Sequence, residues 1–278
     1  ERSRGLGDVY KRQAKGYALT HGIHSRIDGT IAAISERIEA GNIYINRNIV
    51  GAVVGVQPFG GHGLSGTGPK AGGPFYLQRL SNLPYWTMPN PDTPALINSA
   101  NVQEAITIAE EAKRAGELSQ EALERIQQLL TALPERSRHK AVVMLDGPTG
   151  EENSLSYHAP ASVWLYGGTF AQALEAFTEL VANGTKVVIT SDSPLTAWAT
   201  RSQQLLVAEE TVAMRNTITV ALSPLPLATK VALSQTDGAL KKIIAAEHGL
   251  DMAKLYHEVS QSHNTTAAGG NASLMASA

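Results

Sequence analysis

Residues 41–74 read GNIYINRNIVGAVVGVQPFGGHGLSGTGPKAGGP, a short apolar segment followed by a long glycine-rich one. Isoleucine alternates with other residues over 42–46, which predicts a β-strand. Before it, isoleucines recur at helical spacing, so we predict a helix that Asp28 caps and that Gly41 ends. The order helix, strand, long glycine loop is how an α/β domain can end.

The glycine segment contains the spacing G-x-G-x-x-G at Gly61, Gly63 and Gly66. In a dinucleotide site a helix begins where the glycines end, because its N-terminal N–H groups hold the pyrophosphate. Here Thr67 is followed by GPKAGGP, a run of weak helix formers with two prolines. We therefore interpret these glycines as a sharply turning loop and not as a phosphate cradle.

Composition sets outer limits on what the protein is. The 278 residues are 43% apolar and 17% charged, which is typical of a soluble globular protein, and the length suggests about two domains. The net charge of -2 gives no electrostatic reason to expect nucleic acid as a partner. No apolar run approaches the roughly 20 residues of a transmembrane segment, so we expect a cytoplasmic protein. The absence of cysteine excludes a disulfide, a thiolate metal site and a sulfur nucleophile in this chain.

The first thirteen residues, ERSRGLGDVYKRQ, have no clear periodicity and no continuity with the residues after them. They resemble translated adaptor sequence, so we treat residues 1–13 as a non-native segment and leave them out of fold reasoning. We expect the natural protein to continue upstream of Ala14.

A second section begins after a linker rich in proline and asparagine. Residues 84–141 are predicted to be this linker and two connecting helices, over 102–115 and over 119–133 with Pro134 as its end. Residues 142–263 carry a β-α-β pattern that predicts a small doubly wound, Rossmann-like domain. Its expected elements are a strand over 162–166, a helix over 169–182, a strand over 186–190 and further units over 218–222 and 239–246.

Two other local motifs carry a weak chemical signal. Gly167 and Gly168 lie at a strand-to-helix turn and could present N–H groups to a phosphate, although a tight connection is the commoner reason for such a pair. His257-Glu258 begins the zinc motif H-E-x-x-H, but residue 261 is Gln, so the second ligand is missing and no metal site is predicted.

The quoted segment 41–74 resembles the end of an aldehyde dehydrogenase, specifically the L-glutamate γ-semialdehyde dehydrogenase module of bifunctional proline-oxidising enzymes. KGYALTHGIHSRID at 15–28, GPTGEENS at 147–154 and NTTAAGGNASLM at 264–275 are similar to further stretches of those enzymes. The resemblance implies an α/β fold in which residues 14–83 are the C-terminal end of an aldehyde dehydrogenase catalytic domain. The Rossmann-like domain would then be a noncatalytic lid, and 264–278 a terminal motif.

The resemblance also implies a reaction, the NAD-dependent oxidation of L-glutamate γ-semialdehyde, in which a cysteine thiolate attacks the aldehyde. The nucleophilic cysteine, the glutamate base and the NAD domain would precede Ala14, and an FAD-dependent proline dehydrogenase domain would lie further upstream. We therefore expect this chain alone to be inactive and to bind neither cofactor nor metal. Its partners would be the upstream domains of the same enzyme and the substrate. Whether the enzyme forms a homo-oligomer, and whether the full-length enzyme lies at the inner face of the membrane, are both left open.

The same resemblance assigns part of a substrate site to this chain. Backbone amides at Gly51 and Ala52 would hold the substrate α-carboxylate, and Phe59 would pack against its aliphatic portion. His62 departs from the family, which more often has Glu there.

Two other functions remain open on the residues alone. The chain could be a noncatalytic scaffold or interaction protein derived from the aldehyde dehydrogenase fold, with the glycine loop as a partner surface. A nucleotide-binding module using Gly167-Gly168 or the loop Gly61 to Gly66 would predict measurable NAD affinity, which we do not expect. We also expect strand 42–46 to have an unpaired edge, because most of its sheet would lie upstream.

Overall fold

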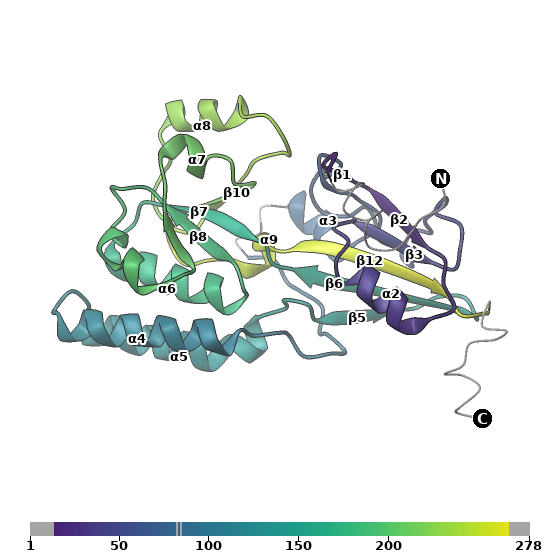
Figure 1. The fold of residues 1–278 in the computed structure, drawn as a ribbon, viewed down its shortest axis with the longest axis horizontal. Helices are drawn as coiled ribbons and strands as arrows, with labels where there is room; N and C mark the ends of the chain where they lie inside the picture. The colour runs from purple at the N-terminus through teal and green to yellow at the C-terminus, as the bar shows by residue number, and fades with distance from the viewer. Residues whose placement is uncertain (1–13, 82, 84, 267–278) are drawn as a thin grey trace.

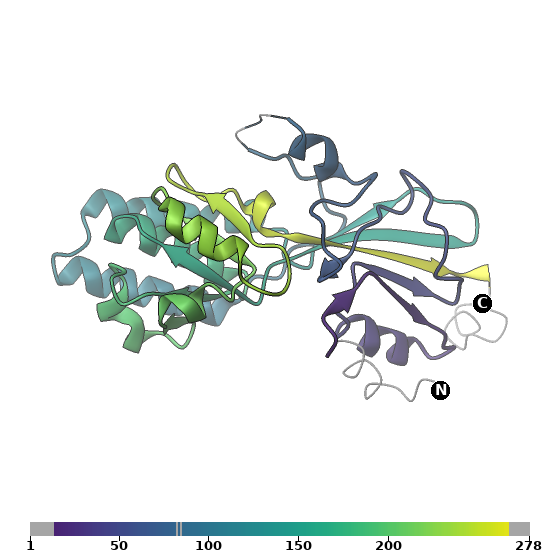
Figure 2. The same ribbon diagram turned by 90° about the horizontal axis from the view of Figure 1, so that it is seen from above.

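Two five-stranded β-sheets, placed end to end, organise the chain in the computed structural model, which describes residues 14–81, 83 and 85–266 (Figure 1). One lobe is built on a mixed sheet and the other on a parallel sheet. Seen from above, strands β6 and β12 run from the mixed sheet toward the parallel one and join the two lobes (Figure 2). The mixed α/β architecture agrees with the predicted fold class.

The mixed sheet has the order β2-β3-β12-β6-β5. Its strands are β2 (Thr20–Ile23), β3 (Asn42–Ile45), β12 (His257–Asn264), β6 (Glu151–His158) and β5 (Val142–Leu145). Strand β3 confirms the prediction over 42–46. The expected unpaired edge is wrong, because β12 pairs in parallel with β3, with Ser260 opposite Asn42, while β2 pairs on the other side.

The parallel sheet has the order β11-β10-β7-β8-β9. Its strands are β7 (Ser162–Tyr166), β8 (Lys186–Ile189), β9 (Leu205–Val207), β10 (Ile218–Ala221) and β11 (Lys242–Ala245). With β7 counted as the first strand this order is 5-4-1-2-3, the order of the first five strands of a Rossmann fold. The predicted doubly wound sheet is therefore confirmed. The strand order reverses between β7 and β10, directly before Gly167.

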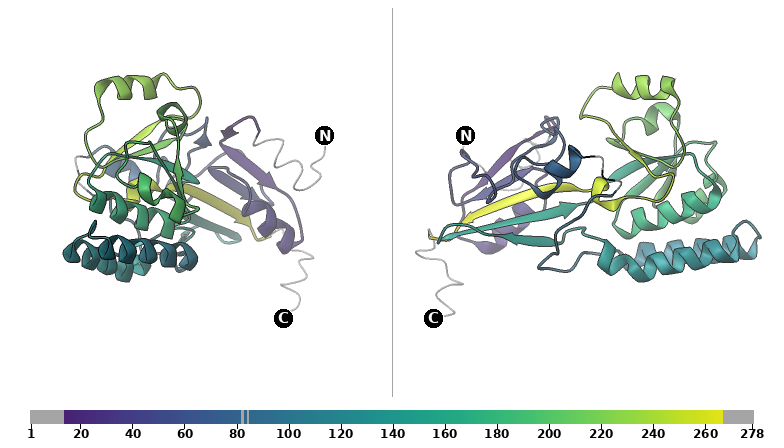
Figure 3. Two further views of the ribbon diagram at one scale, coloured as in Figure 1. Left: turned by 60° about the vertical axis from the view of Figure 1, so that its left-hand side comes forward. Right: turned by 180° about the vertical axis from the view of Figure 1, so that it is seen from behind.

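Helices cover both faces of the parallel sheet. Helix α6 (Phe170–Ala182) packs on one face and is covered by α4 (Ser99–Arg114) and α5 (Gln120–Arg136), which lie side by side below it (Figure 3). Helices α7 (Glu210–Ala213) and α8 (Leu227–Ser234) lie on the other face. Helix α5 passes through Pro134 and ends at Arg136, three residues beyond the predicted range 119–133.

The predicted unit 142–263 is divided between the two sheets. Only the part from β7 to β11 builds the parallel sheet, whereas β5, β6 and β12 belong to the mixed one. The reason is visible along β6, where Asn153, Leu155 and Tyr157 are buried and their neighbours are not. Such alternation suits a strand with one face on a core, while the strands of a doubly wound sheet are buried on both faces.

The remaining elements are short. They are β1 (Tyr17–Ala18) paired with β4 (His62–Gly63), α2 (Asp28–Ser35), α3 (Pro74–Arg79), the 3-10 helix Thr196–Arg201 and α9 (Met252–Leu255). Helix α2 begins at Asp28, but Ile27 is its N-cap residue and the aspartate lies in the first turn. Gly41 does not end this helix. It directly precedes β3, and a Cβ on it would lie 2.0 Å from the Gly60 carbonyl oxygen, so close backbone contact requires glycine there.

Candidate functional site

The loop that follows β3 holds all three predicted site residues, and Gly51 and Ala52 are adjacent in it. Gly51 has φ +85°, a left-handed conformation that favours glycine, and a Cβ placed on it would have no atom within 4 Å. The glycine is therefore required by the path of the backbone and not by crowding. Gly51 is exposed and Ala52 is half-buried, so both lie at the surface of this loop.

The N–H groups of Gly51 and Ala52 form no hydrogen bond with other described residues, and their neighbours on both sides do. The Val50 N–H donates to Asn48 Oδ1 at 3.1 Å, and the Val53 N–H donates to Gln57 Oε1 at 3.0 Å. The adjacent N–H groups of Gly51 and Ala52 therefore remain available as donors, while the N–H groups of Val50 and Val53 on either side are already hydrogen-bonded. A pair of this kind is suited to binding an oxygen anion such as a carboxylate.

Phe59 lies further along the same loop. Its backbone pairs with Ala71 in an antiparallel bridge, with N–H to oxygen distances of 3.0 and 2.8 Å, and its side chain is half-buried. Because the Cβ side of Gly51 is open, the Phe59 ring does not contact that side of the glycine. The structure therefore brings Gly51 and Ala52 together and leaves Phe59 as a separate element of the same loop.

A buried polar network fixes both ends of this loop to the mixed sheet. Gln57, with an exposed fraction of 3%, donates from Nε2 to Glu151 Oε1 at 2.5 Å. Arg47 donates from Nη1 to Glu151 Oε2 at 2.6 Å and to Ser262 Oγ at 2.7 Å. The loop is thus held by β6 and β12, which sequence reasoning missed because nothing local to Glu151 indicates its partners.

The glycine segment is held by a buried lysine. Lys70 donates from Nζ to the carbonyl oxygens of Gly41 and Gly60, at 2.6 and 2.5 Å, and its backbone N–H donates to Glu258 Oε2 at 2.9 Å. Burial lowers the pKa of Lys70 to about 8, opposed by the nearby Glu258 carboxylate. Glu258 therefore has a local role in fixing this segment.

Four histidines from distant parts of the sequence form a row beside this segment, which we call the histidine row: His62, His257, His158 and His139. Successive ring centroids are 4.3, 5.3 and 6.3 Å apart, and the first pair is stacked. Burial lowers the pKa of all four, to about 4 for His139 and His158. His62, the departure from the family pattern, therefore makes a specific contact with β12.

Neither glycine motif forms a phosphate cradle. No helix follows Gly66, since the next one begins at Pro74, as the sequence predicts. At the other motif, a Cβ on Gly167 would lie 2.0 Å from Ser223 Oγ, and one on Gly168 would lie 2.7 Å from Leu222 Cβ. These glycines allow β7 and the segment after β10 to pack closely, which supports the interpretation as a tight connection.

The first turn of α6, beyond those glycines, is already capped. The side chain of Thr169 accepts a hydrogen bond from the Gln172 N–H, and the Gln172 side chain accepts one from the Thr169 N–H. This capping box uses donors that a phosphate would need. The described residues therefore do not fit an NAD site at either glycine motif.

The other negative findings concern membranes and metals. Among the helices that the structure describes, none combines the length and apolarity that crossing a bilayer requires. Within the same residues, His, Asp and Glu side chains form no group of three or more arranged to hold a metal ion, the histidine row included.

Residues 12–85 match the model of the aldehyde dehydrogenase family. The chain is 38% identical over 296 residues to bifunctional protein PutA of Rhizobium meliloti, covering 95% of this chain and 22% of that protein. Against PutA of Escherichia coli K12 it is 37% identical over 279 residues, covering 94% and 21%. A 1-pyrroline-5-carboxylate dehydrogenase of Geobacillus sp. WCH70 is 49% identical over 61 residues, which are 22% of this chain and 12% of that protein.

Among solved structures, proline utilization A (PutA) from Corynebacterium freiburgense superposes with a TM-score of 0.60 at 22% identity. The match covers 93% of this chain and 24% of that one, and it supports the fold. The chain spans about a fifth of the length of the PutA proteins it matches. Through residues 12–85 the chain belongs to the aldehyde dehydrogenase family, and over nearly its whole length it is similar to one part of the bifunctional PutA proteins.

Proposed function

We propose that this chain supplies the substrate-carboxylate loop of an L-glutamate γ-semialdehyde dehydrogenase that acts in proline catabolism. One observation carries the proposal: the adjacent N–H groups of Gly51 and Ala52 have no partner among the described residues, although both flanking N–H groups do. The similarity to PutA and to 1-pyrroline-5-carboxylate dehydrogenases supports the choice of substrate.

In this proposal the loop binds and orients, and does not react. The two N–H groups donate to the α-carboxylate of the substrate, and Phe59 provides an apolar surface for its aliphatic portion. Holding the carboxylate end fixes where the aldehyde end lies, which is how positioning contributes to rate. The network of Arg47, Gln57 and Glu151 keeps the loop in one conformation before the substrate arrives.

The reaction needs groups that this chain does not carry. It contains no cysteine, and its glycine motifs do not fit NAD, so the thiolate, its glutamate base and the NAD site belong to other parts of a longer cytoplasmic protein. The FAD-dependent oxidation of proline belongs to a further domain. We propose that the chain by itself does not oxidise aldehydes.

The parallel-sheet lobe is proposed to be a noncatalytic lid. Strands β6 and β12 lead directly into this lobe and pair with each other along eight residues each, so the lobe is fixed relative to the loop. The same strands hold the loop through Glu151 and Ser262. A lid coupled in this way can enclose a substrate without touching it.

Titration of the ¹⁵N-labelled chain with L-glutamate tests the loop, since glutamate retains the α-carboxylate of the substrate. We expect saturable shifts of the Gly51 and Ala52 amide signals with a Kd on the order of 10 mM. Ala52→Pro removes one donor and should abolish saturation at Gly51. Gly55→Ala is the matched control, because Gly55 also has a positive φ of +82° and open space around it, but both donors remain. Unmoved amide signals, or equal loss in both variants, would refute the assignment.

A further inference from the structure

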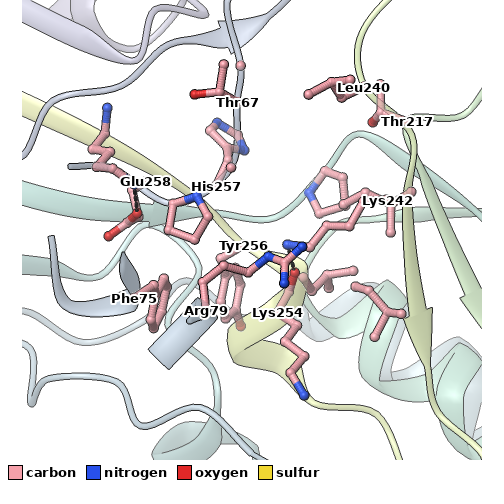
Figure 4. A pocket seen from close by; sticks show the side chains of 18 of the residues that line it. Thr67, Phe75, Arg79, Thr217, Leu240, Lys242, Lys254, Tyr256, His257 and Glu258 are labelled. Carbon is pink, nitrogen blue, oxygen red and sulfur yellow. Dashed lines mark hydrogen bonds between the residues drawn. The ribbon is translucent and has the colours of Figure 1, made fainter. Parts of the chain in front are cut away.

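A cavity of about 760 Å³ lies where the two lobes meet (Figure 4). Helix α3, the glycine segment and the start of β12 line it from the mixed-sheet lobe, and β11 and α9 line it from the other side. Aromatic side chains contribute part of its wall, namely Phe75, Trp86 and Tyr256. None of the predicted site residues lies in it, so the proposed carboxylate loop does not account for this cavity.

The lining of the cavity is strongly cationic. Five basic side chains, Lys70, Arg79, Lys241, Lys242 and Lys254, face a single carboxylate, Glu258. Four of the five have internal partners, Lys242 among them. Lys70 and Lys241 donate to backbone carbonyl oxygens, and Lys254 forms an ion pair with Asp251 at 3.3 Å.

Arg79 and Lys242 remain without a carboxylate in contact. The Arg79 guanidinium, in the last turn of α3, makes no hydrogen bond or ion pair with another described residue. Lys242, on β11, donates to the Lys254 carbonyl oxygen and lies over the Trp86 ring at 5.7 Å. Figure 4 shows the two cationic groups directed toward one another across the cavity.

The charge on Arg79 acts on Lys242. Burial lowers the pKa of Lys242 to about 8, and Arg79 is the charged neighbour that lowers it most, ahead of the opposing effects of Glu258 and Asp251. Two like charges facing each other in a partly enclosed cavity repel more strongly than they would in water. An anion between them would remove that repulsion.

We propose that Arg79 and Lys242 form a binding site for a phosphate dianion, either inorganic phosphate or the phosphate group of a monoester. The planar guanidinium can donate two parallel hydrogen bonds to phosphate oxygens, and the ammonium adds a compact second charge. The ligand would bridge the lobes, because Arg79 belongs to the mixed-sheet side and Lys242 to the parallel sheet. The Trp86 and Phe75 rings in the lining provide an apolar surface for an organic group attached to the phosphate.

Calorimetric titration of the chain with inorganic phosphate, at ionic strength held constant with sodium chloride, tests this site. We expect one site per chain with a Kd on the order of 1 mM. Arg79→Gln should weaken binding about tenfold or more. Arg79 is exposed, so this variant should fold. Arg114→Gln makes the same charge change on exposed α4, away from the cavity, and should leave the Kd unchanged.

The proposal would be overturned if phosphate binding did not saturate at about 50 mM. It would also be overturned if both arginine variants weakened binding equally, because that result would indicate only general charge attraction. A parallel titration with phenyl phosphate distinguishes the two sources of the ligand. Binding at least about tenfold tighter than inorganic phosphate, with quenching of tryptophan fluorescence, assigns the site to a monoester. Equal affinity assigns it to inorganic phosphate.

Discussion

Arg47 and Glu151 are 104 residues apart in the sequence, and Arg47 Nη1 lies 2.6 Å from Glu151 Oε2. This contact joins the loop after β3 to the first residue of β6, and the other Glu151 oxygen accepts from Gln57 in the same loop. One carboxylate therefore holds both ends of the loop that presents the Gly51 and Ala52 donors. The precision of the proposed site depends on a residue that does not touch the substrate.

Glu151→Ala should destabilise the chain substantially. Both side chains of the ion pair are mostly buried, with exposed fractions of 15% and 17%. The variant removes the carboxylate from a buried cation and takes the shortest hydrogen bond from Gln57, and only the Ser262 and Asn153 oxygens remain as side-chain acceptors. We expect the free energy of unfolding in urea to fall by about 2–4 kcal/mol. Glu175→Ala breaks the more exposed pair with Arg125 and should cost less than about 1 kcal/mol. Equal losses would show that the network does not stabilise the loop.

Gly41→Ala should be among the most damaging single changes in the mixed sheet. The new methyl group would lie 2.0 Å from the Gly60 carbonyl oxygen and 2.8 Å from Gly61 Cα, both backbone atoms that cannot move aside. We expect a loss of about 3 kcal/mol or more, measured by thermal or urea unfolding. Gly29→Ala, in helix α2 with open space around it, should be neutral or slightly stabilising. A mild effect at Gly41 would mean that β3 and the glycine segment are not packed as described.

Local patterns predicted some of the elements but not their long-range partners. The strand at 42–46 and the helix at 169–182 were predictable because isoleucine alternation and a continuous apolar face are local signals. Strand β12 was missed because HEVSQSHN contains one aliphatic residue, and its burial comes from lying between β3 and β6. No spacing rule brings together positions such as Arg47 and Glu151.

The isolated chain should show no saturable binding of NAD. Gly167 and Gly168 pack closely against Ser223 and Leu222, and Thr169 with Gln172 already caps α6, which uses N–H donors that a pyrophosphate would need. Titration followed by the fluorescence of NADH, up to about 1 mM, should give a linear response. If NADH binding saturated, and if Thr169→Ala changed its affinity, the result would support the nucleotide-binding alternative instead.

Acid should destabilise the fold through the histidine row. The folded-state pKa values of His139 and His158 are lowered to about 4, by burial first. Lys140 adds to this effect at His139, and His139 and then Lys140 add to it at His158, so these rings stay neutral in the folded chain above about pH 4. Unfolded histidine takes a proton near pH 6.5, so stability is retained above that value and is lost as the pH falls toward about 4. Lys70 acts in the same direction at His62 and His257, and Glu39 opposes it at His62.

His158→Gln isolates this effect from the titration of carboxyl groups. Between pH 6.5 and 4.5 the wild-type chain should lose about 2 kcal/mol more of its unfolding free energy than the variant, because the variant has one proton fewer to take up on unfolding. Urea titrations across that range measure the difference. His248→Gln changes an exposed histidine outside the row and should follow the wild-type curve. If His158→Gln also follows that curve, the row does not hold the His158 ring neutral in the folded chain.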